Sequence, residues 1–363
     1  MRILHVLRSP VGGLFRHVAD LARAQHELGH EIGIVCDSLT GGAAAEGILQ
    51  HLAAFCSLGI SRFPIATFPG FGDLAATRVI GRRALSVQAD VIHGHGAKGG
   101  LYARIAARRL NAIGIYSPHG GSLHYDWLKP PGAVFLAAER ALRFDRTGLI
   151  FVCQYERALY QQKIGLGAVA NTVIYNGLWP HEFASRVLRN DATDLLFVGE
   201  MRKLKGVDTL LDAIAALTLG ERPTLTLVGD GRDMPQFQNQ SKKLGLDTTC
   251  RFVGRKTMAE AKTMGRVLVL PSRHESFPYV ILEAVGAQIP IVASAIGGIA
   301  EILPAECLVP AANAAALAAK VATVKAHEVQ SQQLAVLLQE KARQQFTVAK
   351  MASAVTDFYT TLR

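Results

Sequence analysis

Two glutamates in the second half of the chain are placed where they could bind a polyhydroxylated ligand. Glu275 lies in a polar loop after an apolar run, and Glu283 falls inside the apolar segment 278–287. A helix is predicted from Pro278, because proline suits the first helical position, and the amides of its first turn would form an anion site. The carboxylate of Glu283 needs donors once it is buried. An internal arginine, backbone amides or the vicinal hydroxyls of a sugar would supply them, and we favour the sugar.

Paired carboxylates also perform glycoside hydrolysis, in which one acts as the acid and the other as the nucleophile or base. Here one glutamate lies in a loop and the other in a helix beside a predicted anion site. A hydrolase needs no such site. The pair is therefore interpreted as a clamp for a phosphate-bearing sugar donor.

A basic cluster follows the predicted strand 195–198 and precedes a predicted helix, and it contains Arg202 and Lys205. Cations at such a position would stabilise a diphosphate leaving group as its negative charge grows. The alternative is a solvated charged loop.

Histidines in the first half form a second candidate group. His119 follows the predicted strand 113–116 and precedes two glycines, a position that favours a ligand contact over a structural role. His93 and His95 could suggest a metal pair, but no third ligand at a convincing spacing accompanies them. No metal site is predicted.

Glycines after strands allow a close approach of the backbone to a phosphate or a sugar. The glycine-bearing loops are 11–13, 94–96, 119–121, 199 and 229–231. Neither Gly12-Gly13 nor Gly229-Asp230-Gly231 completes the spacing of a dinucleotide fingerprint, and no P-loop is present. A dinucleotide oxidoreductase is therefore not favoured.

The elements that position these residues form two series of apolar strands alternating with helices, which is typical of α/β proteins with doubly wound parallel sheets. We expect strands at 3–7, 32–36, 91–93, 113–116 and 149–152, and then at 195–198, 225–228, 250–253, 267–270 and 291–293. The expected domains are 1–178 and 194–345, with a linker at 179–193 and a last helix in 346–363 that could pack on the first domain. Ligands bind beyond the carboxyl ends of such strands, so we expect function in a cleft between the domains.

Composition narrows the function classes. The formal net charge is +10, which attracts phosphates, but the basic residues are dispersed and do not favour nucleic acid. The five cysteines are scattered, which fits a reducing compartment, and no stretch approaches the roughly 20 apolar residues of a membrane span. A cytoplasmic protein is expected. Arg104 and Arg108 on one predicted helix face suggest peripheral contact with an anionic membrane surface, with a solvated face as the alternative.

The spacing of Glu275 and Glu283 resembles the paired glutamates of the retaining glycosyltransferases of family 4. The similarity extends over most of the chain, in order, through the segments 12–13, 91–95, 118–120, 175–177, 205–206, 229–231, 286–294 and 297–301. This resemblance implies the GT-B fold, two Rossmann-like domains that face a cleft, and a nucleotide diphosphate sugar as the donor substrate.

By this resemblance, the catalytic residues would be His119, Arg202, Lys205 and Glu275. The donor-binding residues would be Gly12, Gly13, Gly229, Gly231, Gly254, Arg255, Ser276, Phe277, Pro278, Tyr279 and Glu283. Glu283 would hold the ribose hydroxyls and Glu275 the transferred sugar. The chain departs from the family pattern at Pro278, where many members have glycine, and at Glu200, where the family often has arginine. No cofactor and no metal are expected.

The expected acceptor is a glycan or a lipid-linked glycan in cell-surface polysaccharide or glycolipid biosynthesis. Aromatic residues could line its wall or belong to the core, namely Phe68, Phe71, Tyr125, Trp127 and Phe135. Two alternatives stay open: a sugar-nucleotide epimerase or phosphorylase on the same scaffold, and a non-catalytic nucleotide-sugar-binding partner of a polysaccharide assembly complex. Glu200 in the predicted diphosphate loop keeps the last alternative open.

Overall fold

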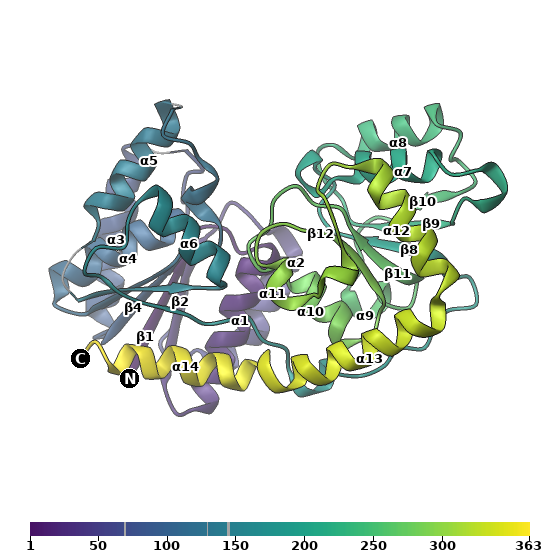
Figure 1. Ribbon diagram of the computed structural model, residues 1–363. Helices are drawn as coiled ribbons and strands as arrows, with labels where there is room; N and C mark the ends of the chain where they lie inside the picture. The colour runs from purple at the N-terminus through teal and green to yellow at the C-terminus, as the bar shows by residue number, and fades with distance from the viewer. Residues whose placement is uncertain (69, 129, 144–145) are drawn as a thin grey trace. The chain divides into compact units, whose positions relative to one another are not determined.

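The computed structural model describes residues 1–68, 70–128, 130–143 and 146–363. The chain divides into two compact units. The first is formed by Met1–Asn176 together with Val348–Arg363, and the second by Gly177–Thr347. Both are built from a parallel sheet with crossover helices (Figure 1), as the alternating apolar runs predict.

Within the described residues, the first unit has a seven-stranded sheet in the order β3-β2-β1-β4-β5-β6-β7. Its strands are β1 (Arg2–Leu7), β2 (Glu31–Asp37), β3 (Gly59–Phe63), β4 (Val91–His95), β5 (Ile113–Ser117), β6 (Thr147–Phe151) and β7 (Ala170–Val173). Its helices are α1 (Gly12–Glu27), α2 (Gly42–Leu52), α3 (Gly72–Ser86), α4 (Gly96–Leu110), α5 (Pro130–Ala141), α6 (Gln154–Lys163) and α14 (Val348–Thr360).

The described part of the second unit has a six-stranded sheet in the order β10-β9-β8-β11-β12-β13. Its strands are β8 (Thr193–Val198), β9 (Leu225–Val228), β10 (Cys250–Phe252), β11 (Gly265–Leu270), β12 (Ile291–Ser294) and β13 (Leu308–Val309). Its helices are α7 (Val207–Ala215), α8 (Met234–Lys243), α9 (Met258–Ala261), α10 (Tyr279–Gly286), α11 (Ile299–Ile302), α12 (Ala314–Ala326) and α13 (Glu328–Gln345).

The two faces of the first sheet are chemically different. Leu4, Val6 and Ile92 pack with helices α3 and α4 in an apolar cluster. Because successive side chains of a strand alternate between faces, His5 and His93 point to the opposite face, where α1 and α14 lie. These two histidines are paired in register between β1 and β4. One face of the first sheet is therefore apolar and the other carries imidazoles.

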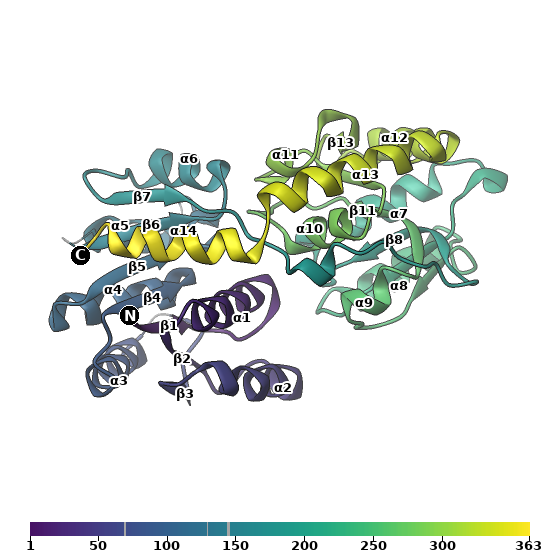
Figure 2. The same cartoon turned by 90° about the horizontal axis from the view of Figure 1, so that it is seen from below.

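Helix α14 lies against α1 within the first unit (Figure 2). Its Tyr359 is fully buried, and its hydroxyl lies 2.7 Å from Nδ1 of His93. The segment 179–193, expected to be a linker, is instead anchored to the second unit. The guanidinium of Arg186 donates to the carbonyl oxygens of Lys262, Gly265 and Arg266, which ties this segment to the start of β11.

The sequence-based expectation that Arg104 faces a membrane surface is wrong, because Arg104 is 1% exposed. Its Nη2 donates to Glu139 at 2.7 Å, its Nε donates to the carbonyl oxygen of Gly100, and its guanidinium lies over the ring of Tyr116. The other oxygen of Glu139 accepts from the hydroxyls of Tyr116 and Ser122. The arginine thus joins α4 to α5 inside the first unit.

Replacing Arg104 with methionine is expected to lower the free energy of unfolding by about 3 kcal/mol, because it leaves the Glu139 carboxylate buried without its cation. Urea unfolding followed by circular dichroism measures this loss. Arg109→Met, on an exposed position of the same helix, is the matched control and should change stability by less than about 0.5 kcal/mol. Equal effects of the two substitutions would contradict the interpretation.

Candidate functional site

The topology of the second sheet places a ligand site between β8 and β11. The chain runs from β8 to β9 and β10 on one side, and then returns to β11, β12 and β13 on the other. Open parallel sheets bind ligands at such a switch point, beyond the carboxyl ends of the strands. The loops that leave β8 and β11 there are residues 199–206 and 271–278, and they carry the predicted cations and Glu275.

Lys205 and Glu275 meet across these two loops. The Nζ of Lys205 lies 2.7 Å from Oε1 of Glu275, and the hydroxyl of buried Ser272 donates to the same oxygen at 2.8 Å. Among the described residues, both hydrogen bonds to Glu275 reach Oε1 and none reaches Oε2. The structure therefore brings together two of the predicted catalytic residues and leaves one carboxylate oxygen for a further donor.

A second ion pair, which the sequence did not reveal, fixes the same two loops. Arg273 donates to both carboxylate oxygens of Asp208, at 2.8 and 2.9 Å, and also to the hydroxyl of Thr209 and the carbonyl oxygen of Lys203. Such a bidentate pair constrains geometry as well as distance. Asp208 lies in the first turn of α7, so this pair holds the start of α7 against the loop that carries Glu275.

Close backbone packing also sets the shape of these loops. Gly206 has φ +71°, and a Cβ there would lie 2.0 Å from the carbonyl oxygen of Pro271. The predicted donor-binding Gly229 packs equally tightly, since a Cβ would lie 1.8 Å from the carbonyl oxygen of Gly199. Gly231 is similarly close to the backbone of Met201. These glycines are therefore needed for packing between loops, whatever they contact in a ligand.

The remaining donor-binding candidates of the second unit lie in the loop after β10, in the loop after β11 and in helix α10. The amide of Gly229 donates to the carbonyl oxygen of Gly254, whereas Arg255 is largely exposed and lies 3.9 Å from Asp230. Pro278 is the N-cap of α10, so the helix begins at Tyr279, one residue later than expected. Glu283 is half-buried among buried apolar residues of α10. The carbonyl oxygen of Ser276 accepts a hydrogen bond from the amide of Gly298. The ring of Phe277 contacts the ring of Phe346.

Arg202 lies beside the residue that departs from the family pattern. Its Nη1 is 3.5 Å from Glu200, and the side chains of Arg202 and Glu200 are 39% and 52% exposed. An exposed ion pair of this length contributes little to stability. Glu200 thus partly neutralises the guanidinium that was expected to serve the diphosphate.

In the first unit, the predicted residues lie at the corresponding edge of the other sheet. Its switch point is between β1 and β4. Gly12 and Gly13 begin α1 and are exposed, and His119 follows β5 with φ +50° and is half-buried. The segment 94–96 was expected to be a loop, but β4 continues through His95.

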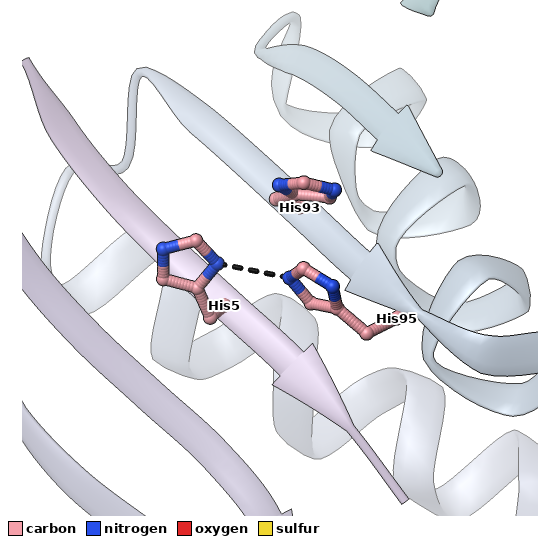
Figure 3. Close-up of side chains that lie close together, drawn as sticks. All are labelled: His5, His93 and His95. Atoms are coloured by element: carbon pink, nitrogen blue, oxygen red, sulfur yellow. Dashed lines mark hydrogen bonds between the residues drawn. The ribbon is translucent and has the colours of Figure 1, made fainter. Parts of the chain in front are cut away.

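Five histidines gather at this edge, and the sequence indicated only three of them. Figure 3 shows His5 of β1 directed at His95 of β4, with Nδ1 of His5 3.0 Å from Nε2 of His95. Nδ1 of His95 lies 3.1 Å from Nε2 of His119. The rings of His17 and His119 pack edge to face, and their centroids are 4.7 Å apart. The sequence carries no separate signal for His5, because only the register between β1 and β4 places it beside His93.

Burial keeps these imidazoles neutral. It lowers the pKa of His5 and of His17 to about 4 and the pKa of His93, His95 and His119 well below the usual value.

Two groups of three histidines have ring nitrogens close enough to bind one metal ion, because the nitrogens lie within 4.8 Å of one another. The first group is His5, His93 and His95, and the second is His17, His95 and His119. A third nitrogen ligand, which sequence spacing did not suggest, is therefore present. In the structure, however, the facing nitrogens of His5, His95 and His119 are hydrogen-bonded to one another.

Two family models match the chain, and together they span most of both units. The model described as "Glycosyltransferase Family 4" matches residues 11–180, and the model described as "Glycosyl transferases group 1" matches residues 192–327. The chain belongs to the group 1, family 4 glycosyltransferases. It is accordingly a glycosyltransferase that uses a nucleotide sugar.

A curated relative is similar over most of the chain, and solved structures share its fold. A glycogen synthase of Mycobacterium tuberculosis is 28% identical over 383 residues, covering 96% of the chain and 91% of the relative. Sucrose-phosphate synthase from Thermosynechococcus elongatus superposes with a TM-score of 0.84 at 19% identity, covering 100% of this chain and 99% of that one. Anabaena HepE, solved in complex with UDP-glucose, superposes with a TM-score of 0.82 at 20% identity, covering 99% and 100%. The fold of this glycosyltransferase is GT-B. In the described part of the chain, no helix has the length and apolar character needed to cross a bilayer.

Proposed function

We propose that this glycosyltransferase transfers a sugar from a nucleoside diphosphate sugar with retention of the anomeric configuration. The observation that carries the proposal is the Lys205–Glu275 pair at the switch point of the second sheet. Lys205 would face the diphosphate, while the unused Oε2 of Glu275 would accept from a hydroxyl of the transferred sugar. Glu283 would accept the ribose hydroxyls, and His119 would contact the donor sugar.

The proposed reaction is a front-face substitution. The bond between the anomeric carbon and the diphosphate oxygen breaks, and the acceptor oxygen bonds to the same face of that carbon. The acceptor's proton passes to the departing phosphate oxygen, so no protein nucleophile is required. The role of the protein is positioning and stabilisation of the negative charge that grows on the leaving group. The proposed acceptor is a hydroxyl of a glycan or lipid-linked glycan.

The test uses the full chain with a panel of uridine and guanosine diphosphate sugars and glycan acceptors. Nuclear magnetic resonance of the product reads the anomeric configuration directly. An α-donor should give an α-linked product, and a β-linked product would refute retention.

A second candidate, a binding module without turnover, is favoured by the ion pair between Glu200 and Arg202. A chain that binds a donor in calorimetry, but neither transfers nor hydrolyses it with any acceptor, would establish this alternative. If the carboxylate opposes diphosphate binding, Glu200→Gln should tighten donor binding about threefold to tenfold. Asp247→Asn, in a loop of the same unit, is the control and should leave donor binding unchanged.

A further inference from the structure

We propose that Gln25, His5 and His95 are positioning residues that fix the tautomer of His119, so that Nδ1 of His119 presents a lone pair to a ligand hydroxyl. This inference rests on the proposed contact of His119 with the donor sugar. It concerns residues of the first unit alone, and it assigns a role to the imidazole face of the first sheet.

The direction of the hydrogen bonds is set at Gln25. Its Oε1 lies 2.9 Å from Nε2 of His5, and its Nε2 donates to the hydroxyl of Tyr359 at 3.4 Å. An amide oxygen only accepts, so Nε2 of His5 carries the proton. Because His5 is neutral, its Nδ1 must then be an acceptor.

The donor and acceptor nitrogens of each following ring are then determined. Nε2 of His95 lies 3.0 Å from the lone pair of His5, so it is the donor, and Nδ1 of His95 becomes an acceptor. Nε2 of His119 lies 3.1 Å from that acceptor and therefore donates to it. Among the described residues, Nδ1 of His119 makes no hydrogen bond. It is left as a lone pair on a half-buried ring.

The side branch is consistent with this direction. The Tyr359 hydroxyl accepts from Gln25 and can donate to Nδ1 of His93 at 2.7 Å, and Nε2 of His93 then donates to the hydroxyl of Ser117 at 2.9 Å. The hydrogen bonds of His93 therefore do not conflict with the order Gln25, His5, His95, His119. Ser117 lies outside that order, because among these rings its hydroxyl hydrogen-bonds to His93 alone.

A lone pair at Nδ1 gives His119 a defined preference. It accepts from a hydroxyl, but it cannot donate to a carbonyl, carboxylate or phosphate oxygen. The fixed tautomer should therefore favour a donor sugar with a free hydroxyl at the contacted carbon. The deoxy analogue at that carbon would lose about tenfold to a hundredfold in kcat/KM, the range expected for one buried hydrogen bond.

The test compares Gln25→Met with Gln25→Glu and Ser117→Ala in the full chain. Methionine removes the acceptor that sets the direction, glutamate restores one, and Ser117→Ala removes a buried histidine contact outside the proposed order. Long-range proton–nitrogen spectra of histidine-labelled, ligand-free protein read the tautomer of His119. We expect Nε2 protonated and Nδ1 bare in the wild type, in Gln25→Glu and in Ser117→Ala, with the protonated Nδ1 form appearing only in Gln25→Met.

The kinetic measurement supplies a second readout. Gln25→Met should raise the donor KM by about tenfold, and Gln25→Glu should largely restore it. A protonated Nδ1 in the wild type, or an unchanged tautomer and KM in Gln25→Met, would overturn the proposal. So would a shift of the His95 and His119 signals on treatment with a chelator, since a metal ion on Nδ1 of His95 would replace the bond from His119. The spectra are recorded without turnover. They can therefore overturn the proposed tautomer even if the proposed function holds, and a failure of the proposed function leaves them unchanged.

Discussion

Lys205→Met is expected to lower kcat by about 100-fold to 1,000-fold while leaving the fold intact. Methionine keeps most of the length of lysine and removes the cation that would oppose the charge growing on the diphosphate. Removing one preorganised stabilising group from a transition state typically has an effect of this size. The effect should fall mainly on kcat, because the charge develops as the bond breaks. Steady-state kinetics with the preferred donor, at saturating acceptor, measures it.

The neighbouring lysine provides the control. Lys203 is exposed, and its hydrogen bonds to Asp233 and Arg273 are made by its backbone and not by its side chain. Lys203→Met should therefore retain activity within about threefold. Glu275→Gln combined with Lys205→Met tests whether the pair acts as a unit, since the double variant should then be little worse than the poorer single one. Full activity of Lys205→Met would remove the ion pair from the proposed mechanism.

Acidification is expected to unfold the first unit sharply below pH 6.5. The pKa of His5 and of His17 is lowered by burial to about 4, whereas an exposed histidine in the unfolded chain titrates near 6.5. Between these values the unfolded state binds more protons than the folded state, so stability falls as the pH falls. These two groups together give a slope of about 3 kcal/mol per pH unit. A domain of ordinary stability would then unfold within about two pH units.

Urea unfolding at pH values from 7.5 to 5 measures this slope. Removing one buried histidine with His17→Leu should reduce the slope by about 1.4 kcal/mol per pH unit, even if it lowers stability at neutral pH by breaking the contact with Asn176. His51→Gln, at an exposed position of α2, should leave the slope unchanged. A slope near zero in the wild type would mean that the cluster is protonated in the folded protein.

The central strands could be predicted from the sequence because each contains a short apolar run, as buried parallel strands do. Of the edge strands in the described residues, β10 was predicted, but β3, β7 and β13 could not be. β3 and β7 lie at the two edges of the first sheet, and their residues are only half-buried. β3 contains Ser61 and Arg62, so it shows no apolar run to mark it. β13, at an edge of the second sheet, has two residues and is too short for any periodicity.

The candidate site was predictable where its residues share one segment, as Glu275 and Glu283 do. Contacts between segments were harder to foresee. Arg273 was visible beside Glu275, but its partner Asp208 lies in α7, and only the sheet order brings the two together. His5 was overlooked for the same reason, because strand register determines its position beside His93 and sequence spacing cannot give it.

The return of α14 to the first unit has a consequence for synthesis of the chain on the ribosome. Residues 1–176 emerge first, but the helix that covers α1 and supplies Tyr359 emerges only after the whole second unit. At usual elongation rates this delay is roughly 10 to 30 s. The second unit is continuous in sequence and can fold during that delay. Of the two units, the one translated first is therefore completed last, and until then its imidazole face is open to chaperones.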